Sequence, residues 1–150
     1  MQPPKQITPT NLSDYLEILS KVVFQSGMSW KVVDTKWPGF REAFDSFDPA
    51  VVASYSPDRL DTLTGDTRII RNRRKIEATV ANSQTLLDLD REFGGFGKYL
   101  KSKDGDFDAL VRDMRKRFKF VGTFGAYYFL YVVGEPVPSH DEFRARMSEI

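Results

Sequence analysis

Apolar residues recur at helical spacing along most of the chain. Between Ser13 and Gly27 they stand at i, i+3, i+4, i+7 and i+8, which is one face of a helix. Asn11 or Ser13 is placed to cap this helix, and Gly27 to end it. The same spacing recurs in residues 107–118, whose opposite face is cationic. No segment alternates as a strand does, so the pattern predicts an all-α chain.

Cap and turn signals divide this pattern into about eight short helices. Ser29 is placed to cap a second helix from Trp30, and Pro38 is expected to interrupt it. The pairs Asp48–Pro49 and Ser56–Pro57 each combine an N-cap residue with proline at the first helical position. They predict two short helices ahead of residue 65.

The second half of the chain adds one long helix and several short ones. Apolar positions predict a long helix over residues 68–93, followed by a glycine break and a short turn over 96–100. Periodicity alone does not separate helix from strand in residues 124–133, although ten residues between glycines favour a helix. Ser139 or His140 would cap a last helix.

Length and composition predict one compact domain. A chain of 150 residues, 41% hydrophobic and 13% aromatic, buries about 70% of its unfolded surface. Residues 1–10 hold three prolines and no periodicity, and are expected to form an extended arm. Residues 11–150 are expected to form the domain.

Several classes of site are excluded or made improbable by residue usage. The chain has no cysteine, which rules out disulfides, thiolate nucleophiles and cysteine metal sites. His140 is the only histidine, so we expect no metal and no cofactor. No apolar run reaches the length of a membrane span, and the first residues lack the apolar core of a signal peptide. We expect a soluble, cytoplasmic protein with no membrane partner.

Basic residues are concentrated although the net charge is only +1. Windows 68–75 and 112–119 hold ten of the 22 lysines and arginines. The first window follows a tight loop at Gly65–Thr67 and is expected to begin a helix at Arg68. A helix N-terminus with cations around it binds phosphate, although a solvated helix face is the structural alternative. The two windows are placed to flank a strand of nucleic acid.

Four segments carry a family resemblance in order and spacing: FQSGMSWKVV, WPGFREAFDSFDPAVVA, IIRNRRKI and KRFKFVGT. Together they resemble the 3-methyladenine DNA glycosylase type I family of the helix-hairpin-helix superfamily, from about Tyr15 to Gly134. The resemblance implies an all-helical fold with a helix-hairpin-helix element. It also implies base excision repair, in which the N-glycosidic bond of an alkylated base in double-stranded DNA is hydrolysed after base flipping. We expect the protein to act as a monomer.

The resemblance assigns three groups of residues to DNA binding. The phosphate-binding hairpin would comprise Gly65, Thr67, Arg68, Arg71, Asn72 and Arg73. The wedge that enters the duplex would comprise Gln25, Gly27 and Met28. The base pocket would comprise Val22, Trp30 and Tyr127. Base extrusion needs such parts because the target atom is unreachable inside the stack.

The chain departs from the family pattern in its pocket. The family's base-recognising glutamate falls on Val22, and its zinc-binding cysteines are missing. No catalytic residue is therefore assigned. Other carboxylates are candidates to compensate, namely Glu17, Glu135 and Asp141. The alternatives to a glycosylase are a catalytically weak or inactive binder of damaged or distorted DNA, and a helical interaction module without a nucleic-acid role.

Overall fold

The structure, a computed structural model, describes residues 4–148 and is all-helical over that range. Within these residues, nine α-helices and one 3-10 turn form a single domain, which confirms the predicted fold class and adds one helix to the expected number. The elements are α1 (Leu12–Gln25), α2 (Trp30–Ala43), η1 (Asp45–Phe47), α3 (Pro49–Ala53), α4 (Pro57–Thr64), α5 (Arg73–Phe93), α6 (Phe96–Leu100), α7 (Phe107–Arg117), α8 (Thr123–Val132) and α9 (His140–Ser148).

Side-chain caps define most helix starts, as the sequence predicted. Asn11 caps α1 by accepting the backbone N–H of Asp14. Ser29, Asp48 and Ser56 cap α2, α3 and α4 in the same way. Each cap satisfies one of the N–H groups that a helix leaves without an internal partner.

Two ambiguities of the sequence are resolved in the C-terminal part. Residues 124–132 lie within α8, so the aromatic run is a helix and not a strand. Ser139 Oγ accepts the backbone N–H of Glu142 at the start of α9, 3.2 Å away. Ser139 therefore caps this helix, and His140 is its first residue.

Helix α2 is continuous, which corrects the expected interruption at Pro38. The aromatic side chains on both sides of the proline hold the helix in the core. Trp37 stacks on Phe40 and Phe47, with ring centroids 4.8 and 5.3 Å apart. This packing outweighs the helix hydrogen bond that a proline cannot donate.

Helix α5 begins at Arg73, five residues later than expected, and ends at Phe93 as predicted. The Asn72 side chain accepts the backbone N–H of Lys75, 3.1 Å away, and so caps the helix. Ile69 lies in the loop before α5, and its burial in the core holds this loop against the rest of the protein. Arg68 and Arg71 consequently lie in the loop between α4 and α5.

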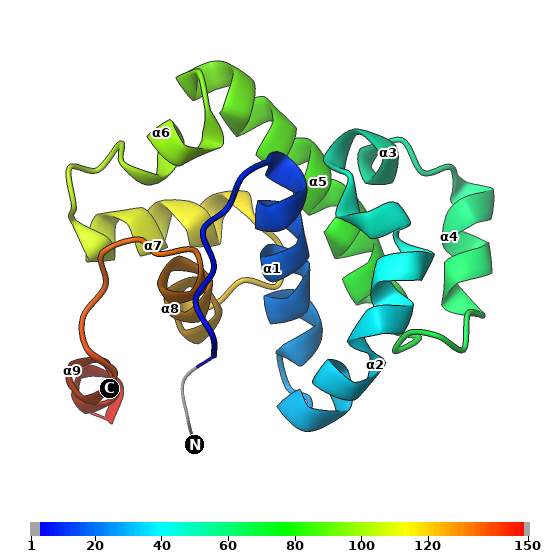
Figure 1. The fold of residues 1–150 in the computed structure, drawn as a ribbon, viewed down its shortest axis with the longest axis horizontal. Helices are drawn as coiled ribbons and strands as arrows, with labels where there is room; N and C mark the ends of the chain where they lie inside the picture. The colour runs from blue at the N-terminus through cyan, green and yellow to red at the C-terminus, as the bar shows by residue number, and fades with distance from the viewer. Residues whose placement is uncertain (1–3, 149–150) are drawn as a thin grey trace.

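Helix α1 is the centre of the fold (Figure 1) and packs against α2, α5 and α8. Leu16, Leu19 and Val23 on this helix are fully buried. Residues 4–10, the described part of the predicted arm, form no helix and lie against α8. The N–H of Ile7 donates to the carbonyl of Val132, 2.7 Å away. The division into arm and domain stays a prediction, and residues 1–3 lie outside the described range.

Candidate nucleic-acid interface

A short exposed turn, residues 26–29, joins α1 to α2. Gly27 has a φ of 71°, which is left-handed backbone that favours glycine. The N–H of Met28 donates to the carbonyl of Gln25, 3.0 Å away, and the Met28 side chain is 39% exposed. The turn therefore presents a large apolar side chain to solvent next to the end of α1. Two of the three residues expected in the wedge, Gly27 and Met28, are exposed, whereas the Gln25 side chain is buried.

Lys75 supports this turn from inside the protein. It is only 5% exposed, and its ammonium donates to the carbonyls of Phe24, 3.1 Å away, and Ser26. Burial lowers the pKa of Lys75. Within residues 4–148 it forms no ion pair with a carboxylate. Lys75 is thus a structural link between α5 and the turn, and not one of the exposed cations of its window.

The loop from Gly65 to Asn72 joins α4 to α5, and it contains most of the residues of the predicted hairpin. Several of its backbone groups are satisfied internally, because the N–H of Ile69 and of Arg68 both donate to Asp66. In the described part of the chain the N–H groups of Thr67, Ile70 and Arg71 donate no hydrogen bond. The loop thus has three backbone donors that remain to be satisfied by water or a ligand.

Ion pairs neutralise two of the five cations in this window. Arg68 binds Asp66 at 2.7 Å and lies 3.6 Å from Glu42. The hydrogen bond from the Arg68 side chain lowers the pKa of the Asp66 carboxyl. Arg73 binds Asp61 at 2.7 Å and Glu77 at 3.0 Å.

Arg71 and Arg74 are exposed and form no ion pair with any residue between 4 and 148. With Lys75 buried, they are the cations of this window whose charge is not balanced by a neighbouring carboxylate. Of the three predicted phosphate-binding arginines, Arg71 has no ion pair within residues 4–148, whereas Arg68 and Arg73 are paired.

Helix α2 holds the hairpin at close range. Lys36 donates to the carbonyl of Thr67, 3.1 Å away. A Cβ atom at Gly39 would lie 2.5 Å from the carbonyl oxygen of Arg68, so only glycine permits this approach. Helix α2, which begins at Trp30, is thus in direct contact with the hairpin.

A cavity of about 580 Å³ lies between α1, α2, α8 and the arm. Trp30 and Tyr128 line it, with ring centroids 4.8 Å apart and ring planes at 80°. A hollow of about 50 Å³ shares these two rings and extends to Phe124. The lining of the larger cavity comprises Pro4, Lys5, Ile7, Glu17, Ile18, Lys21, Val22, Gln25, Trp30, Lys31, Asp34, Trp37, Arg41, Tyr128 and Val132.

Of the three residues expected in the base pocket, Val22 and Trp30 line this cavity but Tyr127 does not. Tyr127 is fully buried, its hydroxyl donates to the carbonyl of Pro138, 2.8 Å away, and its ring stacks on Phe143. Burial raises the pKa of Tyr127. The neighbouring Tyr128 lines the cavity instead. Tyr128 stands four residues before Val132, which also lines the cavity, so the two lie on the same face of α8.

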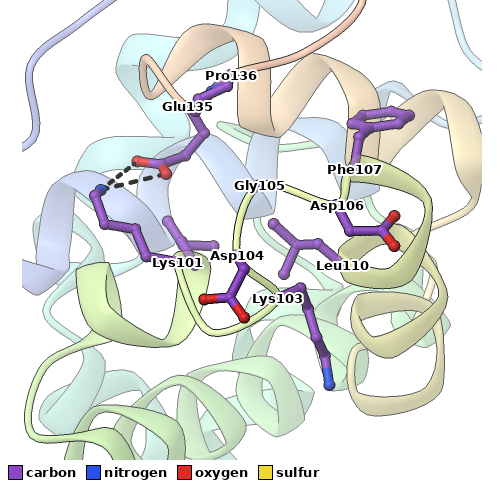
Figure 2. Close-up of a pocket in the computed structure, with 10 residues that line it drawn as sticks. Lys101, Lys103, Asp104, Gly105, Asp106, Phe107, Leu110, Glu135 and Pro136 are labelled. Carbon is purple, nitrogen blue, oxygen red and sulfur yellow. Dashed lines mark hydrogen bonds and ion pairs between the residues drawn. The ribbon is translucent and has the colours of Figure 1, made fainter.

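The three candidate carboxylates lie in different places. Glu17 lines the same cavity as Trp30. Glu135 lines a separate cavity of about 250 Å³ (Figure 2), where Lys101 lies 3.3 Å from its carboxylate. Asp141 lies on α9 and lines neither of these cavities. Glu17 is therefore the candidate that reaches the aromatic cavity.

Asp34 also lines the cavity, and sequence reasoning missed it. It stands four residues after Trp30, on the same face of α2. Its carboxylate binds Lys21 at 2.6 Å.

His140 is enclosed by aromatic rings rather than by metal ligands. Its Nδ1 lies 3.0 Å from the Tyr127 hydroxyl, and the Tyr131 ring contacts it edge-on. Nε2 is buried and has no hydrogen-bond partner in the described structure. Over residues 4–148 no group of three or more histidine or acidic side chains could hold a metal ion.

The second basic window lies at the end of α7 and in the loop after it. Arg117 binds Asp113 at 2.7 Å. The backbone N–H and carbonyl of Lys119 both hydrogen-bond to the Asn82 side chain of α5, at 2.8 and 3.0 Å. The loop is thus fixed to the long helix that starts at the hairpin, while Arg112, Arg115 and Lys116 are exposed on α7.

The fold is that of solved structures of 3-methyladenine DNA glycosylase I. One such structure has a TM-score of 0.74 and 28% identity, and the match covers 85% of this chain and 81% of that one. The enzyme from Staphylococcus aureus, studied for recognition of 3-methyladenine, has a TM-score of 0.74 and 25% identity over 89% of this chain and 79% of its own. No helix within residues 4–148 is long and apolar enough to cross a membrane.

Sequence comparison gives the family. The model for Methyladenine glycosylase matches residues 8–108. DNA-3-methyladenine glycosylase 1 of Escherichia coli is 31% identical over 130 residues, which cover 73% of this chain and 70% of the relative. DNA-3-methyladenine glycosylase of Haemophilus influenzae is 28% identical over the same shares. The chain belongs to the methyladenine glycosylase family.

Proposed function

We propose that this protein is a base excision repair glycosylase that hydrolyses the N-glycosidic bond of an alkylated base such as 3-methyladenine in double-stranded DNA. The family supports this activity, because its relatives carry the name DNA-3-methyladenine glycosylase. The observation that carries the proposal for this chain is the cavity lined by Trp30 and Tyr128, which begins beside the exposed turn at Met28. An extruded base needs a pocket next to the side chain that replaces it in the duplex.

The hairpin would bind the DNA backbone. The backbone N–H groups of Thr67, Ile70 and Arg71 are open donors, and Arg71 and Arg74 are unpaired cations within residues 4–148. Backbone donors and cations at the start of a helix are suited to a phosphate group. Such contacts hold the duplex in register without reading its sequence.

The turn would enter the duplex where the base has left. Unstacking a base costs a few kcal/mol, and an apolar side chain that fills the gap offsets part of this cost. Met28 is exposed on a turn whose first residue, Ser26, is held by Lys75. This support favours insertion of Met28 into the duplex rather than displacement of the turn.

The aromatic rings would select a cationic base. An alkylated purine such as 3-methyladenine carries a positive charge in DNA, and attraction to an aromatic face is worth about 1–2 kcal/mol. The same charge weakens the bond between the base and the sugar. Water adds to the sugar carbon as this bond breaks and loses one proton to the solvent. The bonding electrons leave with the base, which becomes neutral. The reaction therefore needs less proton donation than excision of an unmodified base would.

Incubation of the purified protein with methylated duplex DNA tests the activity. We expect 3-methyladenine to be released faster than without protein, as measured by chromatography of the freed bases. Trp30→Ala should reduce the rate about tenfold or more through lost stacking. Tyr131→Phe is the control, because this tyrosine lies on α8 outside the cavity lining. Release no faster than the uncatalysed rate would exclude the enzymatic activity.

A second candidate function is a non-catalytic binder of damaged or distorted DNA. Val22 favours it, because an apolar side chain stands where the family carries its glutamate, and Val22 packs against Gly125 of α8. Tight, salt-dependent binding to duplex DNA with an abasic site, without base release, would support the binder over the enzyme. We propose a monomer for either function, because turn, hairpin and cavity all come from one chain. Sedimentation of the protein with and without DNA tests this.

A further inference from the structure

Glu17 has one carboxylate oxygen bound and one open. Its Oε2 accepts the indole N–H of Trp37, 2.9 Å away, and the Nε–H of Arg41, 2.6 Å away. Within residues 4–148, Oε1 accepts no hydrogen bond. In the described residues, only two buried side-chain polar atoms lack a hydrogen-bond partner, Ser20 Oγ and His140 Nε2. Glu17 Oε1 also lacks a partner but is not one of these buried atoms, so it is accessible from outside the protein. Because Glu17 lines the aromatic cavity, this open oxygen is available to a ligand there.

The other acid of the cavity is less suited to a ligand. The Asp34 side chain is 56% exposed and is bound by Lys21, whereas the Glu17 side chain is 22% exposed. An acceptor sheltered from water makes the stronger hydrogen bond to a bound group. Glu17 is therefore the more selective of the two acceptors.

Two donors from α2 fix the position of the Glu17 carboxylate. Trp37 and Arg41 both hold Oε2, which limits the rotation of the side chain and so the entropy lost on binding. Arg41 also balances the negative charge of the carboxylate. Oε1 is consequently suited to accept a hydrogen bond from an N–H group, rather than to attract cations at long range.

We propose that Glu17 Oε1 determines specificity by accepting a hydrogen bond from an exocyclic amino group on the edge of the base. The inference rests on the proposed function, since it takes the aromatic cavity as the base pocket. Glu17 and Val22 both lie on α1, and both line the cavity. Glu17 thus stands five residues before Val22, the position at which the family's glutamate aligns, and its carboxylate contacts Trp37. The proposed hydrogen bond requires that a purine stacked on Trp30 presents its amino group to Oε1.

Glu17→Gln tests the assignment because it replaces a hydrogen-bond acceptor in the cavity by a donor. Trp37 Nε1 and Arg41 Nε are both donors, so the amide oxygen of glutamine must face them. The amide NH₂ then occupies the place of Oε1. An acceptor that faces the ligand is replaced by a donor, with almost no change in shape.

The probes are 9-methyladenine and 9-methylpurine, which differ only in the exocyclic amino group. We expect the wild-type protein to bind 9-methyladenine about tenfold more tightly, as measured by NMR titration. In Glu17→Gln this preference should disappear or reverse, because the NH₂ group repels the amino group and can donate to a ring nitrogen of purine. Glu42→Gln is the control: it removes a carboxylate of α2 that binds Arg68 outside the cavity, and the preference should remain.

A merely structural role of Glu17 gives a different result. Loss of support for Trp37 would weaken both probes by the same factor and leave their ratio unchanged, which would overturn the proposal. Absence of saturable binding of either probe to the wild-type protein at millimolar concentration would also overturn it. Base release by the wild-type protein with an unchanged ratio in Glu17→Gln rejects this inference alone. A reversed ratio without base release rejects the glycosylase and retains the role of Glu17.

Discussion

Single residues at the turn between α1 and α2 combine exposure with a fixed backbone. Gly27 provides the left-handed conformation, and a Cβ atom added there would meet no atom within 4 Å. Met28 is exposed beside it, while Lys75 binds the carbonyls on either side of Gln25. The turn is therefore constrained by its backbone and by the buried lysine, and its outer surface is open.

Gly27→Ala should lower the free energy of unfolding by about 1 kcal/mol, because an L-residue is strained at positive φ. Steric contact does not contribute, since the space around the added methyl group is open. Urea denaturation followed by circular dichroism measures the change. Gly65→Ala is the matched control: its φ is −99°, so alanine fits there without strain. Equal losses in the two variants would show that backbone strain is not the cause.

At the scale of elements, α1 and α8 approach closely at the cavity. A Cβ atom at Gly125 of α8 would lie 2.6 Å from Val22 Cγ1 of α1. The apolar residue at position 22 thus has a packing role, because it fills the space that this glycine leaves. The contact also sets the position of Tyr128, three residues further along α8.

Gly125→Ala should destabilise the wild-type protein by about 1–3 kcal/mol, because the added methyl group overlaps the valine. The same substitution should cost much less in a Val22→Ala background, where the overlapping atom is gone. Chemical denaturation of the two single variants and the double variant gives the coupling energy. A coupling energy near zero would mean that the two helices separate to accommodate the methyl group.

Local sequence signals predicted the helices well but not their rotation about their own axes. Asn11 and Ser29 cap their helices through residues three positions away, so the signal lies within a few residues. Whether Tyr127 or Tyr128 faces the cavity depends instead on how α8 packs against α1 and α9. The continuity of α2 through Pro38 likewise depends on aromatic contacts with η1.

For the whole molecule, the hairpin, turn and cavity form one connected unit. Lys75 joins the start of α5 to the turn, and Lys36 and Gly39 join α2 to the hairpin. The charge pattern on this unit was only partly predictable. Five basic residues in the first window were evident, but two of the carboxylates beside them come from other helices: Asp61, which binds Arg73, and Glu42, which lies 3.6 Å from Arg68.

This difference in pairing predicts unequal contributions to DNA binding. Arg71→Gln with Arg74→Gln removes the two arginines of the first basic window that have no ion pair in the described residues, and should weaken binding to abasic-site duplex DNA. The slope of log affinity against log salt concentration should fall in magnitude by up to about 2. Each arginine that contacts a phosphate releases about one counterion from the DNA, and the variant lacks two such arginines. Fluorescence anisotropy at several salt concentrations measures this slope.

The matched control is Arg68→Gln with Arg73→Gln, which removes the same charge from the same window. These arginines are bound by Asp66 and Asp61, at 2.7 Å in each case. Removal of these paired arginines should change the slope less. It leaves Asp66 and Asp61 unpaired, but the salt in the solution screens their repulsion of the DNA. An equal or larger change in the control would mean that the ion pairs open on binding, and that the hairpin presents all four arginines to the phosphates.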